Sequence, residues 1–350
     1  MKKYLFILAA AAALAACSKT EVVPVNSDAD VEITFLTAPL TKALGTGQSA
    51  FSTENVFQSA AFYDTKAFAY GSTSAETFIK PTTVKFFDPV WKAADENGNA
   101  VTYYWPKDGG KLSFFSWSFN KNTLTYEASS PTVDINKENG VVLTDYYVGN
   151  NEDFMVAEPA LDQTGNKTTY THEGVPTLFK HKLAQIVFQA KTNADYTVAP
   201  YKQKFTITRI YFEQAAEKAT YKQYVSETVK DQWTVASNGL VYYLTLDGIK
   251  HVVQSGDATI VASDAVDFYI PQSFTADNQK LIVEYTVSRA SDAGTVSSNY
   301  SESVSLKTLL GKIECGKKYT ITLTFGLDQI YWDPAVQDWT EVNSGSIDIK

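Results

Sequence analysis

An alternation of apolar and polar residues with a period of two recurs along this chain and restricts it to folds built from half-buried strands. The clearest case runs from Tyr319 to Leu327, where five apolar side chains share one face and three threonines and a glycine share the other. Similar alternation occurs at residues 31–35 and 184–190, and less regularly at 281–287. Since successive side chains of a strand point to opposite faces, this period predicts antiparallel strands with one face on a core.

Turn signals rich in Asn and Gly separate these runs at short intervals. They lie within residues 96–99, 107–110, 138–140, 163–166 and 237–239. An Asn-Gly pair between strand-like runs is a strong hairpin signal. Residues 213–224 come nearest to a helical stripe, and they fit a long loop equally well. The sequence therefore predicts an all-β protein, most simply two sandwiches.

The first seventeen residues form an export signal. Lys2 and Lys3 precede an apolar run from Tyr4 to Ala16, which is too short to span a bilayer and suits a signal peptide. Residues 14–17, Leu-Ala-Ala-Cys, resemble the bacterial lipobox, in which the cysteine receives a diacylglycerol thioether and becomes the mature N-terminus. We therefore predict lipidation of Cys17. An ordinary signal peptide followed by a chance cysteine is the alternative.

Composition limits the partners and the covalent chemistry of the mature chain. Loss of residues 1–16 leaves 334 residues and moves the formal charge from −9 to −11, which argues against nucleic acid as a partner. Apart from Cys17 the only cysteine is Cys315, so no intrachain disulfide can form. We predict a signal peptide at 1–16, a lipidated tether at 17–30, and sandwiches at 31–174 and 175–350, divided in the polar stretch 158–174.

No motif for enzymatic or metal chemistry stands out. The three histidines, His172, His181 and His251, lack a second ligand three to five residues away, so we interpret them as core or surface residues. Residues 95–99 superficially resemble a calcium loop, but the sixth position is not glycine and the twelfth is not acidic, so a hairpin turn explains them better. We predict no enzyme, no cofactor and no metal, although sequence alone cannot test a glycosidase-type carboxylate pair.

Aromatic residues cluster at Trp91, at 103–105 and at 114–119, and they allow two interpretations. Exposed rings could form a carbohydrate-binding platform. A core is favoured because Phe115, Trp117 and Phe119 fall on one face of a predicted strand. Cys315 has no histidine nearby and is interpreted as a small packed residue.

Five motifs occur in a characteristic order along the mature chain. They are Trp91…Tyr103-Tyr-Trp-Pro106…Gly110-Lys-Leu-Ser-Phe-Phe115, Asp153-Phe-Met-Val-Ala157, Phe179-Lys-His-Lys-Leu183, Phe268-Tyr-Ile-Pro-Gln272 and Gly316-Lys-Lys-Tyr-Thr-Ile321. Together with the lipobox, this succession resembles the fimbrillin family, the lipoprotein pilins and pilin-like proteins of type V pili. The resemblance implies two tandem transthyretin-like (Greek-key) β-sandwich domains after a lipoprotein signal peptide.

The resemblance also implies a function, that of a structural pilus subunit that supports adhesion. Such subunits are cut by an outer-membrane protease after a basic residue beyond the first strand, and a neighbouring subunit then donates a strand to the opened groove. On this chain, Val31, Ile33 and Phe35 would form the strand that masks the groove, and cleavage would fall between Lys42 and Ala43. Ile347 and Ile349 would anchor a donated C-terminal strand, unless the tail is an edge strand of its own domain.

One departure from the family pattern leaves two outcomes open. The best-known members are cut after arginine, whereas this chain has no arginine before Arg209. If Lys42 is cut, the partners are other pilus subunits and the processing protease, and the product lies in the fimbrium. If it is not cut, the chain stays in the cell outer membrane through the lipid on Cys17, as a pilus anchor or a free surface lipoprotein with a host or glycan ligand.

Overall fold

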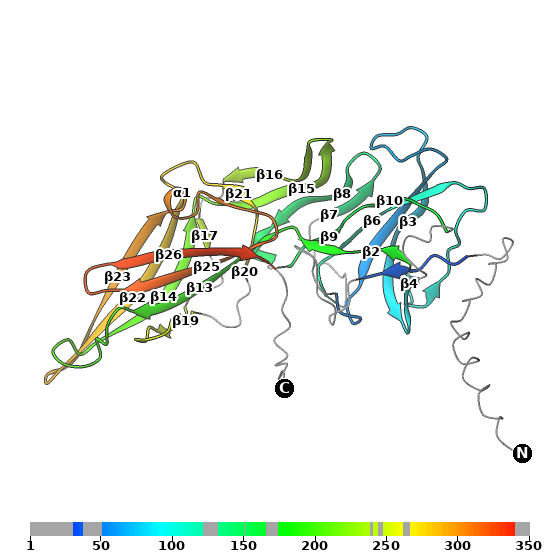
Figure 1. Ribbon diagram of the computed structural model, residues 1–350. Coiled ribbons are helices and arrows are strands. Elements are labelled where there is room, and N and C mark those ends of the chain that lie inside the picture. The colour runs from blue at the N-terminus through cyan, green and yellow to red at the C-terminus, as the bar shows by residue number, and fades with distance from the viewer. Residues whose placement is uncertain are drawn as a thin grey trace, which may run out of the picture. The chain divides into compact units, whose positions relative to one another are not determined.

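The computed structural model describes residues 31–37, 51–121, 132–150, 152–165, 174–238, 241–243, 248–261 and 267–339. Across these ranges the chain is almost entirely β, with twenty-six strands, the one-turn helix α1 (Leu306–Leu309) and the 3₁₀ turn η1 (Val148–Asn150) (Figure 1). The chain divides into Met1–Val31, of which only Val31 is described, and Glu32–Lys350. No helix in the described ranges is long and apolar enough to cross a membrane.

A ten-stranded sheet carries most of the first half of the chain. Its main path runs β11 (Val175–Pro176), β1 (Phe35–Leu36), β4 (Val90–Ala94), β3 (Glu76–Phe87), β2 (Phe57–Asp64), β6 (Lys111–Ser118), β9 (Met155–Ala157) and β12 (Phe179–His181). Off this path, β5 (Ala100–Val101) pairs with β4, and β10 (Ala160–Gln163) pairs with β6. β11 and β12 follow the predicted domain boundary at residue 174 yet pair with strands that precede it. The division at 174 stays a prediction.

Both faces of β6 are buried, in two different clusters. Leu112 and Phe114 lie in a cluster with Phe57 and Trp91, enclosed by the ten-stranded sheet. Residues 115, 117 and 119 point the other way into the main core. All three of these aromatic side chains are buried, which confirms the prediction that they share a core-facing side.

A four-stranded sheet covers that second face and joins two hairpins that are distant in sequence. Its order is β16 (Val229–Asn238), β15 (Ala216–Ser226), β8 (Gly140–Tyr147) and β7 (Thr132–Asn136). The β7–β8 turn confirms the hairpin predicted at 138–140. The expectation of a helix or loop over 213–224 was wrong, because β15 hydrogen-bonds to β16 on one side and to β8 on the other. Such long-range pairing overrides a local pattern.

The second half forms a β-sandwich. One sheet has the order β19 (Thr259–Ile260), β13 (Ala184–Thr192), β25 (Lys317–Phe325) and β26 (Ile330–Asp338), with β20 (Asp267–Tyr269) also on β13. The other has the order β17 (Val241–Tyr243), β14 (Gln203–Glu213), β22 (Lys280–Ser291) and β23 (Gly294–Ser305), with β18 (His251–Val252) also on β14. β21 (Gln272–Ser273) and β24 (Lys312–Ile313) pair separately. Phe205 and Tyr285 on one sheet meet Phe325 on the other, with ring centroids 5.7 and 5.1 Å apart.

The alternating runs at 184–190, 281–287 and 319–327 are confirmed as strands β13, β22 and β25. Two details of the prediction were wrong. β13 and β25 run parallel to each other, since the chain passes through the opposite sheet between them. Leu327 is exposed because β25 ends at Phe325, two residues before the alternation ends.

Candidate functional site

The N-terminal segment (residues 32–37) is a short strand inserted into the ten-stranded sheet. Its side chains alternate as the sequence predicts: Ile33, Phe35 and Thr37 are buried, with exposed fractions of 3, 4 and 6 %. Val31, predicted to share this inward side, is 36 % exposed. The buried stripe is therefore two apolar residues followed by a threonine.

Strands distant in sequence supply the backbone partners of this segment on both edges. On one edge, Phe35 pairs with Trp91 of antiparallel β4, and the Ile33 N–H donates to the Tyr103 carbonyl at 2.8 Å. On the other edge, β11 runs parallel. There the N–H groups of Val175 and Thr177 donate to the carbonyls of residues 34 and 36, both at 2.7 Å.

Phe35 fills an aromatic pocket. Its ring meets Phe57 and Phe114 edge-on, with centroids 5.6 and 5.8 Å apart and interplanar angles of 81° and 88°. Ile33 lies in the same buried cluster. Burying side chains of this size contributes roughly 1.5–3 kcal/mol each, so the pocket holds the segment mainly by apolar contact.

Polar contacts on the outer side of the segment are weaker. Glu32 forms an ion pair with Lys92 at 2.7 Å and accepts a hydrogen bond from the Thr102 hydroxyl at 3.1 Å. Both charged side chains are partly exposed, and such pairs are worth only about 0–1 kcal/mol. They therefore add little to the stability of the segment.

Gly174 allows β11 to approach the segment closely. Its φ is +104°, and a Cβ built at this position would lie 2.6 Å from the Thr34 carbonyl oxygen. Both the backbone conformation and the space therefore require glycine. The site prediction missed Gly174 and Val175, although a glycine beside a strand-like residue can signal close backbone approach.

Removal of residues 32–37 would open a groove with two hydrogen-bonding rims. The Tyr103 carbonyl and the N–H groups of Val175 and Thr177 would lose the partners described above. The pockets of Ile33 and Phe35 would be emptied at the same time, two residues apart. Unpaired backbone groups with pockets at every second residue are what a β-strand from another chain recognises.

The remaining predicted site residues lie outside the described ranges. Cys17, Lys42 and Ala43 precede residue 51 and fall in the gaps before and after the N-terminal segment. Ile347 and Ile349 follow the last described residue, 339.

The positions considered for metal or catalytic chemistry have structural partners. The Asp95 carboxylate accepts the backbone N–H groups of Asn97 and Asn99 and the Asn99 side-chain amide, which confirms a turn. The hydrogen bond from the Asn99 side-chain amide is the main cause that lowers the pKa of Asp95. Among the histidines, His181 is buried against Asp153 at 2.8 Å, His251 faces the Thr259 hydroxyl at 3.2 Å, and His172 is outside the described residues.

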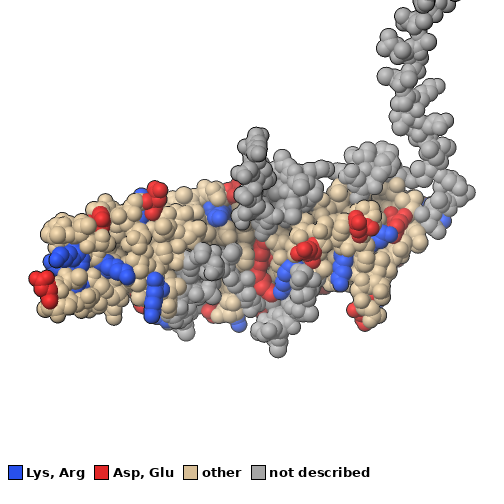
Figure 2. Space-filling view, turned by 90° about the horizontal axis from the view of Figure 1, so that it is seen from below, with Lys and Arg blue, Asp and Glu red and all other residues tan. Residues whose placement is uncertain are grey.

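Charged side chains are mixed on the surface. On the face shown in Figure 2, Lys and Arg are interspersed with Asp and Glu rather than gathered into one basic area. A continuous basic surface is the usual requirement for binding a phosphate backbone. The described part of the face in Figure 2 has no continuous basic surface of this kind.

Comparisons with known proteins match the chain to one family and to several solved structures. The model of the fimbrillin-like family matches residues 57–339. A fimbrial protein from Bacteroides vulgatus superposes with a TM-score of 0.64 at 16 % identity, covering 88 % of this chain and 99 % of that one. A candidate cell adhesion protein from Bacteroides uniformis superposes with a TM-score of 0.44 at 15 % identity, covering 88 % of this chain and 98 % of that one. The tip fimbrial protein Mfa3 from Porphyromonas gingivalis superposes with a TM-score of 0.37 at 9 % identity, covering 88 % of this chain and 100 % of that one.

Comparison with curated protein sequences returned no match. The family match, in contrast, covers most of the chain, and the solved fimbrial structure shows the same all-β fold. The resemblance found in the sequence is thereby confirmed. The protein belongs to the fimbrillin-like family, and its role is structural or adhesive, of the pilus type at the cell surface, and not enzymatic.

Proposed function

We propose that this chain is a fimbrial subunit, exported as a lipoprotein on Cys17 and assembled by β-strand donation after its N-terminal segment is removed. One observation carries the proposal. Residues 32–37 form a strand that is buried in an aromatic pocket and paired on both edges with strands distant in sequence. A segment held in this way can be exchanged for a similar strand without rebuilding the rest of the sheet.

Cleavage after Lys42 would separate this segment from the body of the subunit. Lys42 lies between residue 37, where the described part of the segment ends, and Phe51, which is buried in the same cluster as Phe35. A cut there frees the lipid, the tether and the segment together. Until that cut, the segment keeps the groove closed and prevents premature pairing at an open sheet edge.

The C-terminal tail of a neighbouring subunit is the proposed donor. Ile347 and Ile349 are separated by one polar residue, as Ile33 and Phe35 are. A strand with this spacing presents two apolar side chains to the two emptied pockets, while its backbone meets both rims. Assembly therefore replaces a strand of the same chain by one of another chain.

The processing step is tested by mapping the N-terminus of the protein taken from its native cell surface. We expect a species that begins at Ala43, together with oligomers that survive mild detergent and dissociate on heating. Lys42→Gln should retain acylated Cys17 and lose the oligomers, whereas the exposed-residue control Lys66→Gln should behave as the wild type. Finding only acylated Cys17 in the wild type would contradict polymerisation and support a pilus anchor or free surface lipoprotein.

The donor is tested separately with Ile347→Asp combined with Ile349→Asp. We expect normal cleavage at Lys42 but no oligomers, because charged side chains cannot enter the two apolar pockets. Oligomers at the wild-type level would show that another strand is donated.

A further inference from the structure

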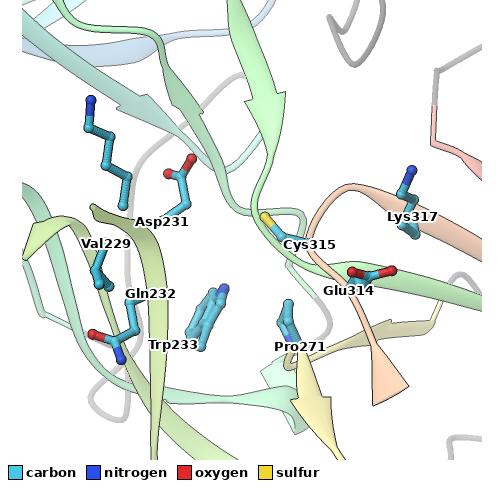
Figure 3. Close-up of a pocket in the computed structure, with 9 residues that line it drawn as sticks. Val229, Asp231, Gln232, Trp233, Pro271, Glu314, Cys315 and Lys317 are labelled. Carbon is cyan, nitrogen blue, oxygen red and sulfur yellow. The ribbon is translucent and has the colours of Figure 1, made fainter. Parts of the chain in front are cut away.

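A surface hollow of ≈ 430 Å³ lies between strand β16 and two turns of the second sandwich (Figure 3). Trp233 and Gln232 of β16 line one side, and Pro271 and Glu314 line the other. Ligand sites for small molecules generally measure about 300–1,000 Å³. The hollow is therefore large enough for a small ligand, and it is separate from the groove that holds the N-terminal segment.

Trp233 is a fixed aromatic wall of this hollow. Its indole N–H donates to the Lys182 carbonyl at 2.6 Å. Its ring packs against Tyr146 and Tyr221, with centroids 5.8 and 5.3 Å away. The polar atom of the indole is thus satisfied within the protein, and the part of the half-buried ring that reaches the hollow is an apolar surface with little freedom to move.

Charged and polar side chains line the hollow together with the Trp233 indole. Asp231 and Glu314 contribute two carboxylates, and Lys230 and Lys317 contribute two ammonium groups. The exposed Gln232 amide can both donate and accept hydrogen bonds. Asp231 is paired with Lys182, Glu314 with Lys312, and Lys317 with Asp338. Because these charges are neutralised within the protein, the rim offers hydrogen-bond donors and acceptors to a neutral polar molecule more readily than a net charge to an ion.

Internal contacts hold the two carboxylates in position. Asp231 accepts a hydrogen bond from the Tyr221 hydroxyl and forms an ion pair with the Lys182 ammonium group at 2.9 Å. Glu314 forms an ion pair with Lys312 at 2.7 Å, and its backbone N–H donates to the Tyr319 hydroxyl at 2.9 Å. A carboxylate can accept up to about four hydrogen bonds, so both retain capacity for a ligand.

The cysteine in the hollow favours binding over reaction. Burial raises the pKa of the Cys315 thiol to about 11, so at neutral pH the thiol is protonated rather than a thiolate nucleophile. The donor set of the hollow is therefore an aromatic face, two carboxylates, an amide and two ammonium groups.

We propose that this hollow binds a neutral pyranose sugar. The apolar C–H face of the ring would lie against the Trp233 indole and the Pro271 ring, and its hydroxyls would exchange hydrogen bonds with Gln232 and Glu314. The inference does not depend on strand donation, because none of these residues contacts the N-terminal segment. It adds a ligand class to an adhesive role and places the carbohydrate platform at a tryptophan outside the aromatic clusters considered above.

The test follows indole N–H signals by NMR while the full-length chain is titrated with lactose, maltose and methyl glucoside, and with sialyllactose and glucosamine as charged comparators. Trp233→Leu identifies the Trp233 signal and keeps an apolar side chain in its place. We expect a neutral sugar to shift that signal and to bind with a Kd in the roughly millimolar range. We expect Trp233→Leu and the exposed-rim variant Gln232→Ala each to weaken binding about tenfold or more.

Trp332→Leu is the matched control, because Trp332 is also half-buried against the main core but lies outside the hollow. We expect it to bind sugar as the wild type does. The proposal is overturned if no neutral sugar moves the Trp233 signal at about 20 mM, well above a millimolar Kd, or if the charged sugars bind as tightly as the neutral ones. Oligomer formation by Trp233→Leu is measured in parallel, so that loss of sugar binding is separated from loss of strand donation.

Discussion

The His181 imidazole stacks flat on the Trp339 indole, with ring centroids 3.6 Å apart and 7° between the ring planes. His181 lies on β12 of the first-half sheet, while Trp339 directly follows β26, the last strand of the second-half sandwich. The Trp339 indole also stacks with the Phe268 ring, with centroids 5.3 Å apart. This stack joins β12 of the first-half sheet to the end of the second-half sandwich.

We predict that Trp339→Ala lowers the free energy of unfolding by about 3–5 kcal/mol, as is usual for truncation of a buried tryptophan. The loss arises from both stacking contacts and from the cavity that remains. Chemical denaturation followed by circular dichroism measures it. Tyr331→Ala, on the preceding strand β26 and 52 % exposed, should cost less than about 1 kcal/mol. Equal losses in the two variants would contradict a structural role for the stack.

A second prediction concerns Gly174, whose absent Cβ leaves room for the Thr34 carbonyl. Gly174→Ala should destabilise the protein and speed amide exchange at Val175 and Thr177, because their N–H groups donate to the N-terminal segment. Native-state hydrogen exchange measures this directly.

Gly256→Ala provides the matched control for that experiment. Its φ of +97° is close to the +104° of Gly174, but a Cβ there would meet nothing within 4 Å. Both variants carry the same backbone strain, so the difference between them reports the contact with Thr34. If Gly256→Ala speeds exchange at Val175 as much as Gly174→Ala does, the close approach does not hold the segment.

Strand positions were predictable where burial alternates along one strand. Ile33 and Phe35 show this, as do the four buried residues 319, 321, 323 and 325 of β25. An alternating pattern depends only on which face meets the core, so it is present in the local sequence. The local sequence does not show which strand pairs with which, and the parallel pairing of β13 with β25 was therefore missed.

The same limit applies to the two sites. Val175 pairs with Phe35 across about 140 residues of chain, and nothing near either residue indicates the other. Trp233 lies in a strand whose alternation looks ordinary, between the exposed residues Gln232 and Thr234. Its role as a wall depends on Pro271 and Glu314, which only the folded chain brings to the same hollow.

A third prediction follows from the half-buried Cys315 thiol. Burial is the main cause that raises the pKa of Cys315 to about 11. In a Cys17→Ser background it is the only thiol, and at pH 8 it should react with a disulfide reagent on the order of a hundredfold more slowly in the folded protein than in denaturant, where the pKa returns to about 8.5. A reaction rate in the folded protein within about threefold of the denatured rate would contradict the raised pKa of Cys315.

A fourth prediction is a loss of stability at alkaline pH. Burial is the main cause that raises the pKa of Tyr70, Tyr221 and Tyr285 above the ordinary value of 10.0. The folded state therefore keeps these phenols neutral, while the unfolded chain ionises them near pH 10. Their contribution to stability is complete below pH 10 and is lost as the pH rises toward the folded-state pKa values.

Denaturation midpoints at pH 8, 9.5 and 11, with tyrosinate absorbance recorded in parallel, measure this loss. We expect the midpoint to fall between pH 9.5 and 11 and part of the tyrosinate signal to appear only on unfolding. Tyr70→Phe removes one of these phenols and keeps a ring to stack on Tyr224, whose centroid lies 3.6 Å away. This variant should lose less stability than the wild type between pH 8 and 11, because its unfolded state has one fewer group to ionise. An identical loss in both proteins would exclude Tyr70 as a source of the alkaline instability.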